Sequence, residues 1–193
     1  AQALLPLLDA DDAEASVEQA RDALADYEPA FDAAYLSGMR AKLGLREQRA
    51  DDPALAAALL DIMAANSVDY TNLFRDLASL RLDGAASDAA LRDRFIDRQA
   101  FDAWADDYRA RLRAEGSVDG AARAAAMRAV NPRYVLRNYL AQQAIERAER
   151  GDFAEVDRLL ELLSHPFDEQ PERQGYAAEP PDWGRHLEVS CSS

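Results

Sequence analysis

The chain has 193 residues, of which 49% are hydrophobic and 30% are charged, and this composition supports a folded core and excludes wholesale disorder. Asp and Glu number 36 against 22 Lys and Arg, so the formal net charge is −14. A surface this negative repels phosphate backbones and anionic lipid headgroups, so we expect neither nucleic acid nor a membrane to be a partner.

The sequence also bounds the compartment. No uninterrupted apolar stretch approaches the 18 or so residues that a membrane helix needs, and no secretory signal is recognisable. The single cysteine, Cys191, excludes an internal disulfide and suits a reducing compartment, so we expect a cytoplasmic protein. Residues 1–8 are apolar and uncapped, which predicts that the chain is a piece cut from a longer protein.

Helix signals dominate from the start. Ser16 and Gln19 form a capping box and predict a helix that begins there. Pro29 should kink this helix or split it in two, and Gly44 should end it. Apolar residues recur every three or four positions along it and predict one buried face, made of Leu24, Tyr27, Phe31, Tyr35, Met39 and Leu43.

The next helices begin at aspartates. Asp51, Asp52 and Pro53 predict a helix that ends near residues 66–67, and Asp69 should cap a short helix after it. A loop is expected at residues 84–87, before a helix that ends at Gly116. The predicted inward residues of these helices are Leu55, Leu59, Ile62, Met63, Phe101, Trp104, Tyr108 and Leu112.

The last third of the chain divides into helices and a tail. Asn131-Pro132 predicts a helix start, and Gly151 should end that helix. Asp152 should then cap a final helix with Phe153, Val156, Leu160 and Leu163 inward. Prolines and glycines predict an extended strap after it. We therefore expect an all-α fold, with a multi-helix region over 1–164 and an extended, irregular tail over 165–193.

A search for chemistry returns few candidates. The sequence lacks a glycine-rich phosphate loop, and its only lysine, Lys42, lies in a predicted helix. His165, His186 and Cys191 are too few for a zinc site, and we interpret the histidines as solvated or packed tail residues. Adjacent acids on a helix point about 100° apart, so we interpret three acid pairs as caps and solvated charges. These pairs are Asp11-Asp12, Asp51-Asp52 and Asp106-Asp107. We therefore predict no catalytic, cofactor or metal residue in this segment.

Two arginines and the cysteine remain candidates. Arg133 and Arg137 are expected one helical turn apart, beside Asn138. They suit either an anion or partner carboxylate, or structural ion pairs with internal acids, and we favour the structural role because the chain has so many carboxylates. For Cys191, the nearby Glu188 favours a neutral thiol, whereas accessibility near the chain end favours oxidation. Its chemistry alone leaves both a redox role and an incidental one open.

Several stretches, taken together, resemble one family. They are Lys42–Leu45, Asp69–Arg75, Asn131–Leu140, Gly151–Asp152, His165–Gln170, Pro180–Trp183 and Val189–Ser193. Their order and spacing resemble the selenoprotein O (YdiU-like) protein adenylyltransferases over nearly the whole chain. The ending is the most specific part, because members with selenocysteine carry it at the position of Cys191.

The resemblance implies a kinase-like fold that binds ATP with magnesium and transfers AMP to Ser, Thr or Tyr hydroxyls of other proteins. It implies that this segment is the helical end of the large lobe plus a C-terminal extension. The groups that hold ATP and magnesium would lie upstream, so the implied partners are the catalytic half of the same polypeptide and the protein substrates. Cys191 is implied as a redox candidate that needs a second thiol from outside this chain.

Two other functions remain open from the residues alone. The chain could be a free-standing helical module for protein interaction without enzymatic activity. It could also be a thiol-dependent redox protein built around Cys191, in which case replacement of that residue by serine should abolish any response to oxidants.

Overall fold

The computed structural model describes residues 13–83, 88–116 and 120–187. Within these ranges every regular element is a helix, which confirms the predicted all-α class. The α-helices are α1 (Ala13–Lys42), α2 (Asp52–Ala65), α3 (Tyr70–Asp76), α4 (Ala89–Arg92), α5 (Arg98–Ala114), α6 (Gly120–Val130), α7 (Asn138–Ala148) and α8 (Ala154–Ser164). Three 3₁₀ segments, η2 (Leu77–Ser79), η4 (Pro171–Ala177) and η5 (Asp182–Gly184), complete the set.

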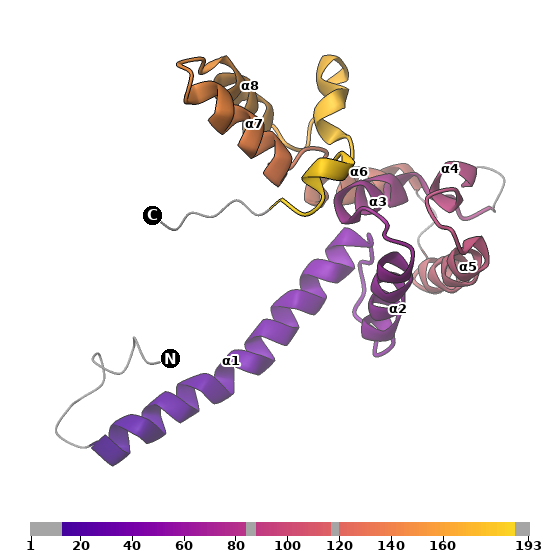
Figure 1. The fold of residues 1–193 in the computed structure, drawn as a ribbon. Helices are drawn as coiled ribbons and strands as arrows, with labels where there is room; N and C mark the ends of the chain where they lie inside the picture. The colour runs from indigo at the N-terminus through magenta and orange to yellow at the C-terminus, as the bar shows by residue number, and fades with distance from the viewer. Residues whose placement is uncertain (1–12, 84–87, 117–119, 188–193) are drawn as a thin grey trace.

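The first and larger core lies between the C-terminal end of α1 and helices α2 to α6 (Figure 1). Most of the predicted inward residues of α2 and α5 are buried there. Trp104 stacks on Tyr108 with ring centroids 5.0 Å apart, and the Tyr108 hydroxyl donates to the Leu43 carbonyl. None of the described helices is long and apolar enough to cross a membrane.

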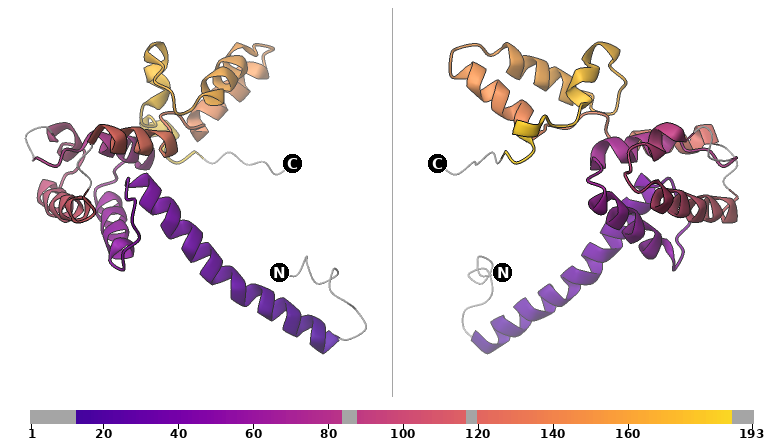
Figure 2. Two further views of the ribbon diagram at one scale, coloured as in Figure 1. Left: turned by 180° about the vertical axis from the view of Figure 1, so that it is seen from behind. Right: turned by 45° about the vertical axis from the view of Figure 1, so that its right-hand side comes forward.

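The second core is smaller and joins α7, α8 and the tail. α7 and α8 lie side by side in Figures 1 and 2, and Tyr134, Leu159 and Leu162 are buried with them. The tail was expected to be extended, but it forms η4 and η5, and Ala177 from η4 enters the second core. The proline-rich spacing is compatible with short 3₁₀ turns, which need few consecutive helical residues.

Helix α1 differs from the prediction at three points. It begins at Ala13, so Ser16 lies inside it rather than at its cap, because the preceding alanine-rich residues themselves favour helix. It runs through Pro29 as one helix of 30 residues, so Pro29 does not split it in two. Met39 and Leu43 are buried as expected, but Leu24, Tyr27, Phe31 and Tyr35 are exposed, because α1 projects beyond the body of the molecule (Figures 1 and 2).

The helix predicted to start at Asn131 begins instead at Asn138. Asn131 closes α6, since its backbone N–H donates to the Met127 carbonyl. The backbone N–H groups of Arg133 and Tyr134 both donate to the Pro166 carbonyl, 2.8 and 3.1 Å away. The tail thus binds residues 133 and 134 in a segment that lies outside any helix.

Three of the four residues predicted to face inward from the last helix do not. Phe153, Val156 and Leu160 are exposed, and Leu159 and Leu162 are buried in their place. Leu163 packs against the second core as predicted. Both faces of this helix carry apolar residues at helical spacing, so periodicity alone could not choose between them. Asp152 was predicted to be the N-cap of this helix, but Phe153 takes that position; the Asp152 carboxylate accepts from the Ala154 N–H at 3.1 Å.

Gly44 and Gly116 offer a matched test of packing. Both have positive φ, 66° and 68°, which costs an L-residue about 1–2 kcal/mol. A Cβ at Gly44 would lie 2.8 Å from Met127 Cγ, whereas one at Gly116 would have no neighbour within 4 Å. We expect Gly44→Ala to lower the free energy of unfolding by about 1–3 kcal/mol more than Gly116→Ala, because the core must also shift. Urea unfolding of both variants measures this, and equal losses would contradict it.

Candidate functional site

Four polar side chains fasten the tail to the helices, and we call them the tail anchor: Asn72, Arg75, Tyr134 and Asn138. The amides of Asn72 and Asn138 donate to the carbonyls of Ala177 and Leu187, at 3.1 and 2.8 Å. The Tyr134 hydroxyl donates to the Gln170 carbonyl at 3.0 Å. The anchor therefore holds the tail at points spread along residues 167–187.

Arg75 is the centre of the tail anchor. Its side chain is almost fully buried, and Nη1 donates to the carbonyls of Arg128 and Asn131 at 2.8 and 3.0 Å. Nη2 donates to the Phe167 carbonyl at 2.9 Å and to Glu169 Oε1 at 2.7 Å. The Arg75 guanidinium also holds the pKa of Glu169 below its usual value. One side chain thus joins α3, the end of α6 and the tail.

The structure places the two predicted arginines in the extended segment between α6 and α7, rather than one turn apart on a helix. Arg137 makes a two-point contact with Asp69, at 2.6 and 3.0 Å. Arg133 Nη1 lies 3.9 Å from Asp76 Oδ1. Both guanidinium groups therefore face acids of α3 and its cap, which is the geometry of internal ion pairs.

Asp69 provides a pH prediction. Burial alone would raise its pKa, but hydrogen bonds from Arg137 and from the Asn72 N–H outweigh burial and lower it. Because the pKa of Asp69 is lower in the folded state, its ionised carboxylate stabilises the fold at any pH above the unfolded-state pKa of about 3.9. This stabilisation is lost as the pH falls through the folded-state pKa. Asp69→Asn keeps the helix cap but removes the charge. We expect it to be less stable than wild type at pH 7 and to approach wild type below about pH 4 in urea unfolding. A constant difference across this range would contradict the assignment.

A second buried ion cluster lies between α2 and α5. Arg111 Nε donates to Asp52 Oδ1 at 2.6 Å, and its Nη1 donates to Glu115 Oε2 at 3.1 Å. From the sequence we interpreted Asp52 only as part of a cap and did not predict this cluster. The signal was present, because Arg111 falls on the same helical face as Trp104 and Tyr108.

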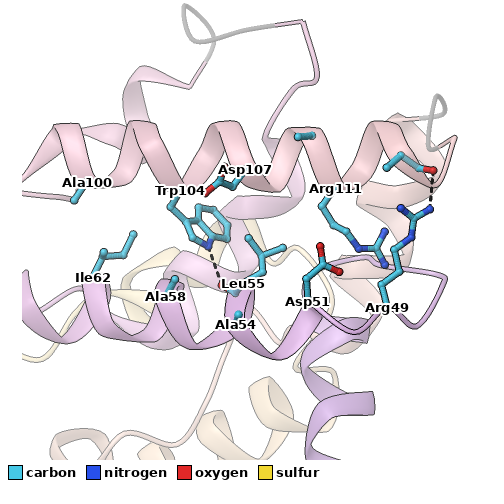
Figure 3. A pocket seen from close by; sticks show the side chains of 12 residues that line it. Arg49, Asp51, Ala54, Leu55, Ala58, Ile62, Ala100, Trp104, Asp107 and Arg111 are labelled. Carbon is cyan, nitrogen blue, oxygen red and sulfur yellow. Dashed lines mark hydrogen bonds between the residues drawn. The ribbon is translucent and has the colours of Figure 1, made fainter.

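A groove of about 620 Å³ runs along the surface between α2 and α5 (Figure 3). Its polar contacts are internal: Trp104 Nε1 donates to the Leu55 carbonyl at 3.0 Å, and Arg49 donates to the Ala114 carbonyl at 2.7 Å. Small side chains form much of its lining, including Ala54, Ala58, Ala100, Ala110 and Ala114. This groove has the shape of a packing surface and offers no nucleophile paired with a base.

The remaining candidates are in the tail. His165 and His186 are exposed, and Cys191 lies outside the described residues. In the part of the chain that the structure describes, no group of three His, Cys, Asp or Glu side chains is placed to hold a metal ion. What the described residues bring together is therefore a set of ion pairs and hydrogen bonds that fix the tail and the helices.

The sequence comparisons identify the class. The model of the family described as "Protein adenylyltransferase SelO" matches residues 1–164, and the chain belongs to this family. The resemblance noted from short stretches of sequence is thereby confirmed.

Curated relatives extend the match to the whole chain. "Protein nucleotidyltransferase YdiU" of Burkholderia multivorans is 56% identical over 201 aligned residues, which cover 100% of this chain and 38% of the relative. The proteins of the same name from Burkholderia lata and Paraburkholderia xenovorans are 55% and 52% identical, again over 100% of this chain and 38% of theirs. The chain therefore spans well under half the length of the curated relatives it matches.

Proposed function

We propose that residues 1–193 are the C-terminal helical region of a protein adenylyltransferase, within the large lobe of a kinase-like fold. The observation that carries this proposal is the match of the full chain, at 56% identity, to 38% of a relative named a nucleotidyltransferase. We call the full-length protein the parent protein. Its single cysteine within this segment suits a cytoplasmic location.

In this proposal the parent protein transfers AMP from ATP to a Ser, Thr or Tyr hydroxyl of a protein substrate. The hydroxyl oxygen bonds to the α-phosphorus, the bond to the β-phosphate oxygen breaks, and pyrophosphate leaves. Magnesium would offset negative charge on the phosphates. The catalytic half upstream of residue 1 supplies the groups that hold ATP and magnesium.

The role of this segment is structural. The tail anchor and the Arg111 cluster fix helices from both cores, so they provide a rigid support for the catalytic half. Buried arginines with several hydrogen bonds suit such a role, because their planar groups bond in several directions at once.

The test is AMP transfer with ATP labelled on the α-phosphate. The parent protein should label protein hydroxyls in the presence of magnesium, and residues 1–193 alone should not. ATP labelled on the γ-phosphate controls for kinase activity and should leave no label. Labelling by residues 1–193 alone, or γ-phosphate transfer by the parent protein, would overturn the proposal. A parent protein without either activity would favour a helical interaction module instead.

We also propose Cys191 as a redox-sensitive position, paired with a thiol outside this chain. An oxidant should change AMP transfer by the wild-type parent protein, and Cys191→Ser should abolish that change. Ser190→Ala, at the neighbouring position, is the matched control and should respond like wild type. A response that persists in Cys191→Ser would remove this role.

A further inference from the structure

The N-terminal half of α1 carries an apolar surface that no described element covers. Leu24, Tyr27, Phe31 and Tyr35 are 54%, 65%, 54% and 45% exposed, and we call these four side chains the aromatic face. Tyr27 and Phe31 are stacked with centroids 6.1 Å apart, and Phe31 and Tyr35 repeat this spacing. A contiguous apolar stripe of this kind marks an interaction site more often than isolated exposed residues do.

The aromatic face continues directly into the first core. One turn beyond Tyr35, Met39 is buried, and its Sδ lies 4.0 Å from the hydroxyl of Tyr70 on α3. Tyr70 is itself exposed on the same side, with the Lys42 ammonium 5.4 Å from its ring centroid. The exposed stripe is therefore an extension of a core-forming surface, and it stops being covered only where α1 leaves the body (Figure 2).

The flanks of the face differ. At 100° per residue, Ala30, Ala34 and Gly38 lie along one side of the stripe, and a Cβ at Gly38 would meet nothing within 4 Å. Small residues allow another backbone to approach closely beside the rings. Glu28 and Asp32 lie along the other side and are exposed. The surface thus suits a closely packed protein partner with polar or basic groups at one edge.

We propose that the aromatic face is the surface through which this chain docks onto the catalytic half of its parent protein. The inference rests on the proposed function, and it specifies where the two halves meet. The catalytic half is long enough to cover the aromatic face, because more than half of each curated relative lies outside the match to this chain. α1 is also the first described element, so it is the described helix nearest in sequence to an upstream catalytic half.

Two other occupants fit the surface less well. In a symmetric pair of copies, α1 would pack on α1, and the acids along its edge would add to the repulsion between two chains of net charge −14. An anionic membrane is repelled by the same charges, and amphipathic membrane helices carry Lys and Arg on their polar face instead. The catalytic half of the same polypeptide has neither disadvantage, since it is tethered to α1.

Hydroxyl-radical footprinting of the intact parent protein tests the docking. The measured quantity is the rate at which hydroxyl radicals oxidise Tyr27 and Tyr35. Buried Tyr108 in the same molecule gives the rate of a protected side chain, and the denatured protein gives the rate of an exposed one. We expect Tyr27 and Tyr35 to react as slowly as Tyr108 at every protein concentration. Reaction at the denatured rate would overturn the inference. Protection that appears only as concentration rises would overturn it in favour of a second copy.

Two variants separate the surface from the helix. Phe31→Asp places a charge in the aromatic face, and Ala33→Asp places the same charge on the opposite side of α1. Phe31→Asp should abolish the protection of Tyr27 and Tyr35, and Ala33→Asp should retain it. Equal protection of the two tyrosines in both variants would contradict docking through the aromatic face. AMP transfer is measured separately. If the parent protein transfers AMP but Tyr27 and Tyr35 are unprotected, the docking proposal fails and the proposed function stands. If Tyr27 and Tyr35 are protected but no AMP is transferred, the docking proposal stands and the proposed function fails.

Discussion

Arg75→Met should lower the free energy of unfolding by about 3–5 kcal/mol, because the variant keeps most of the apolar stem and loses every hydrogen bond of the guanidinium. Three backbone carbonyls, those of Arg128, Asn131 and Phe167, would then lie without their donor, and Glu169 would lose its ion pair. Urea or thermal unfolding monitored by circular dichroism measures the loss.

Arg158→Met is the control for this result. Arg158 also pairs with an acid, Glu155, at 3.1 Å, but its side chain is 56% exposed, so its loss should cost less than about 1 kcal/mol. The tail also reports on Arg75 directly. Limited proteolysis should cut residues 165–187 faster in Arg75→Met than in Arg158→Met. Equal stability and equal cleavage in the two variants would show that the tail does not depend on Arg75.

Arg111→Met should have an effect of similar size, about 3–5 kcal/mol at pH 7, for a different reason. The variant leaves two buried carboxylates, Asp52 and Glu115, without the guanidinium that both contact. The pKa of Asp52 depends strongly on this guanidinium. Burial alone would raise the pKa of Asp52, but the hydrogen bonds and charge of Arg111, together with the hydrogen bond from the Arg49 N–H, lower it.

The loss caused by Arg111→Met should also depend on pH. In wild type, the lowered pKa of Asp52 means that stability is lost as pH falls through it. In the variant, burial should raise the pKa of the unpaired Asp52 above its value in the unfolded chain, so acid should relieve part of the penalty. The difference between wild type and variant should therefore narrow from pH 7 to pH 4. A difference that widens would mean that the carboxylates find other partners.

The sequence predicted the helices better than their faces. Caps at Asp51 and Asp69 and stops at Gly44 and Gly151 were located correctly, because these signals are local. The exposed half of α1 was predicted to be buried, since periodicity reveals an apolar face but not what covers it. The start of α7 was missed for a tertiary reason, because Pro166, more than 30 residues away, binds the backbone at 133–134.

The polar contacts were the least predictable part. The four acceptors of Arg75 come from two segments far from it in sequence, the end of α6 and the tail, and no local pattern specifies them. The Arg111 cluster was in principle detectable, since a charged residue at a core position of a helix must find a buried partner. Which acid it would meet could not be determined, given 36 to choose from.

The long reach of Arg75 also bears on how the molecule forms during synthesis. Its contact with Glu169 spans 94 positions, and that with Phe167 spans 92. While the chain grows on the ribosome, α3 and α6 can assemble, yet two of the acceptors of Arg75 do not exist until residue 169 has emerged. The larger core must therefore pass through a stage with a half-satisfied guanidinium at its margin, and the late arrival of the tail completes it.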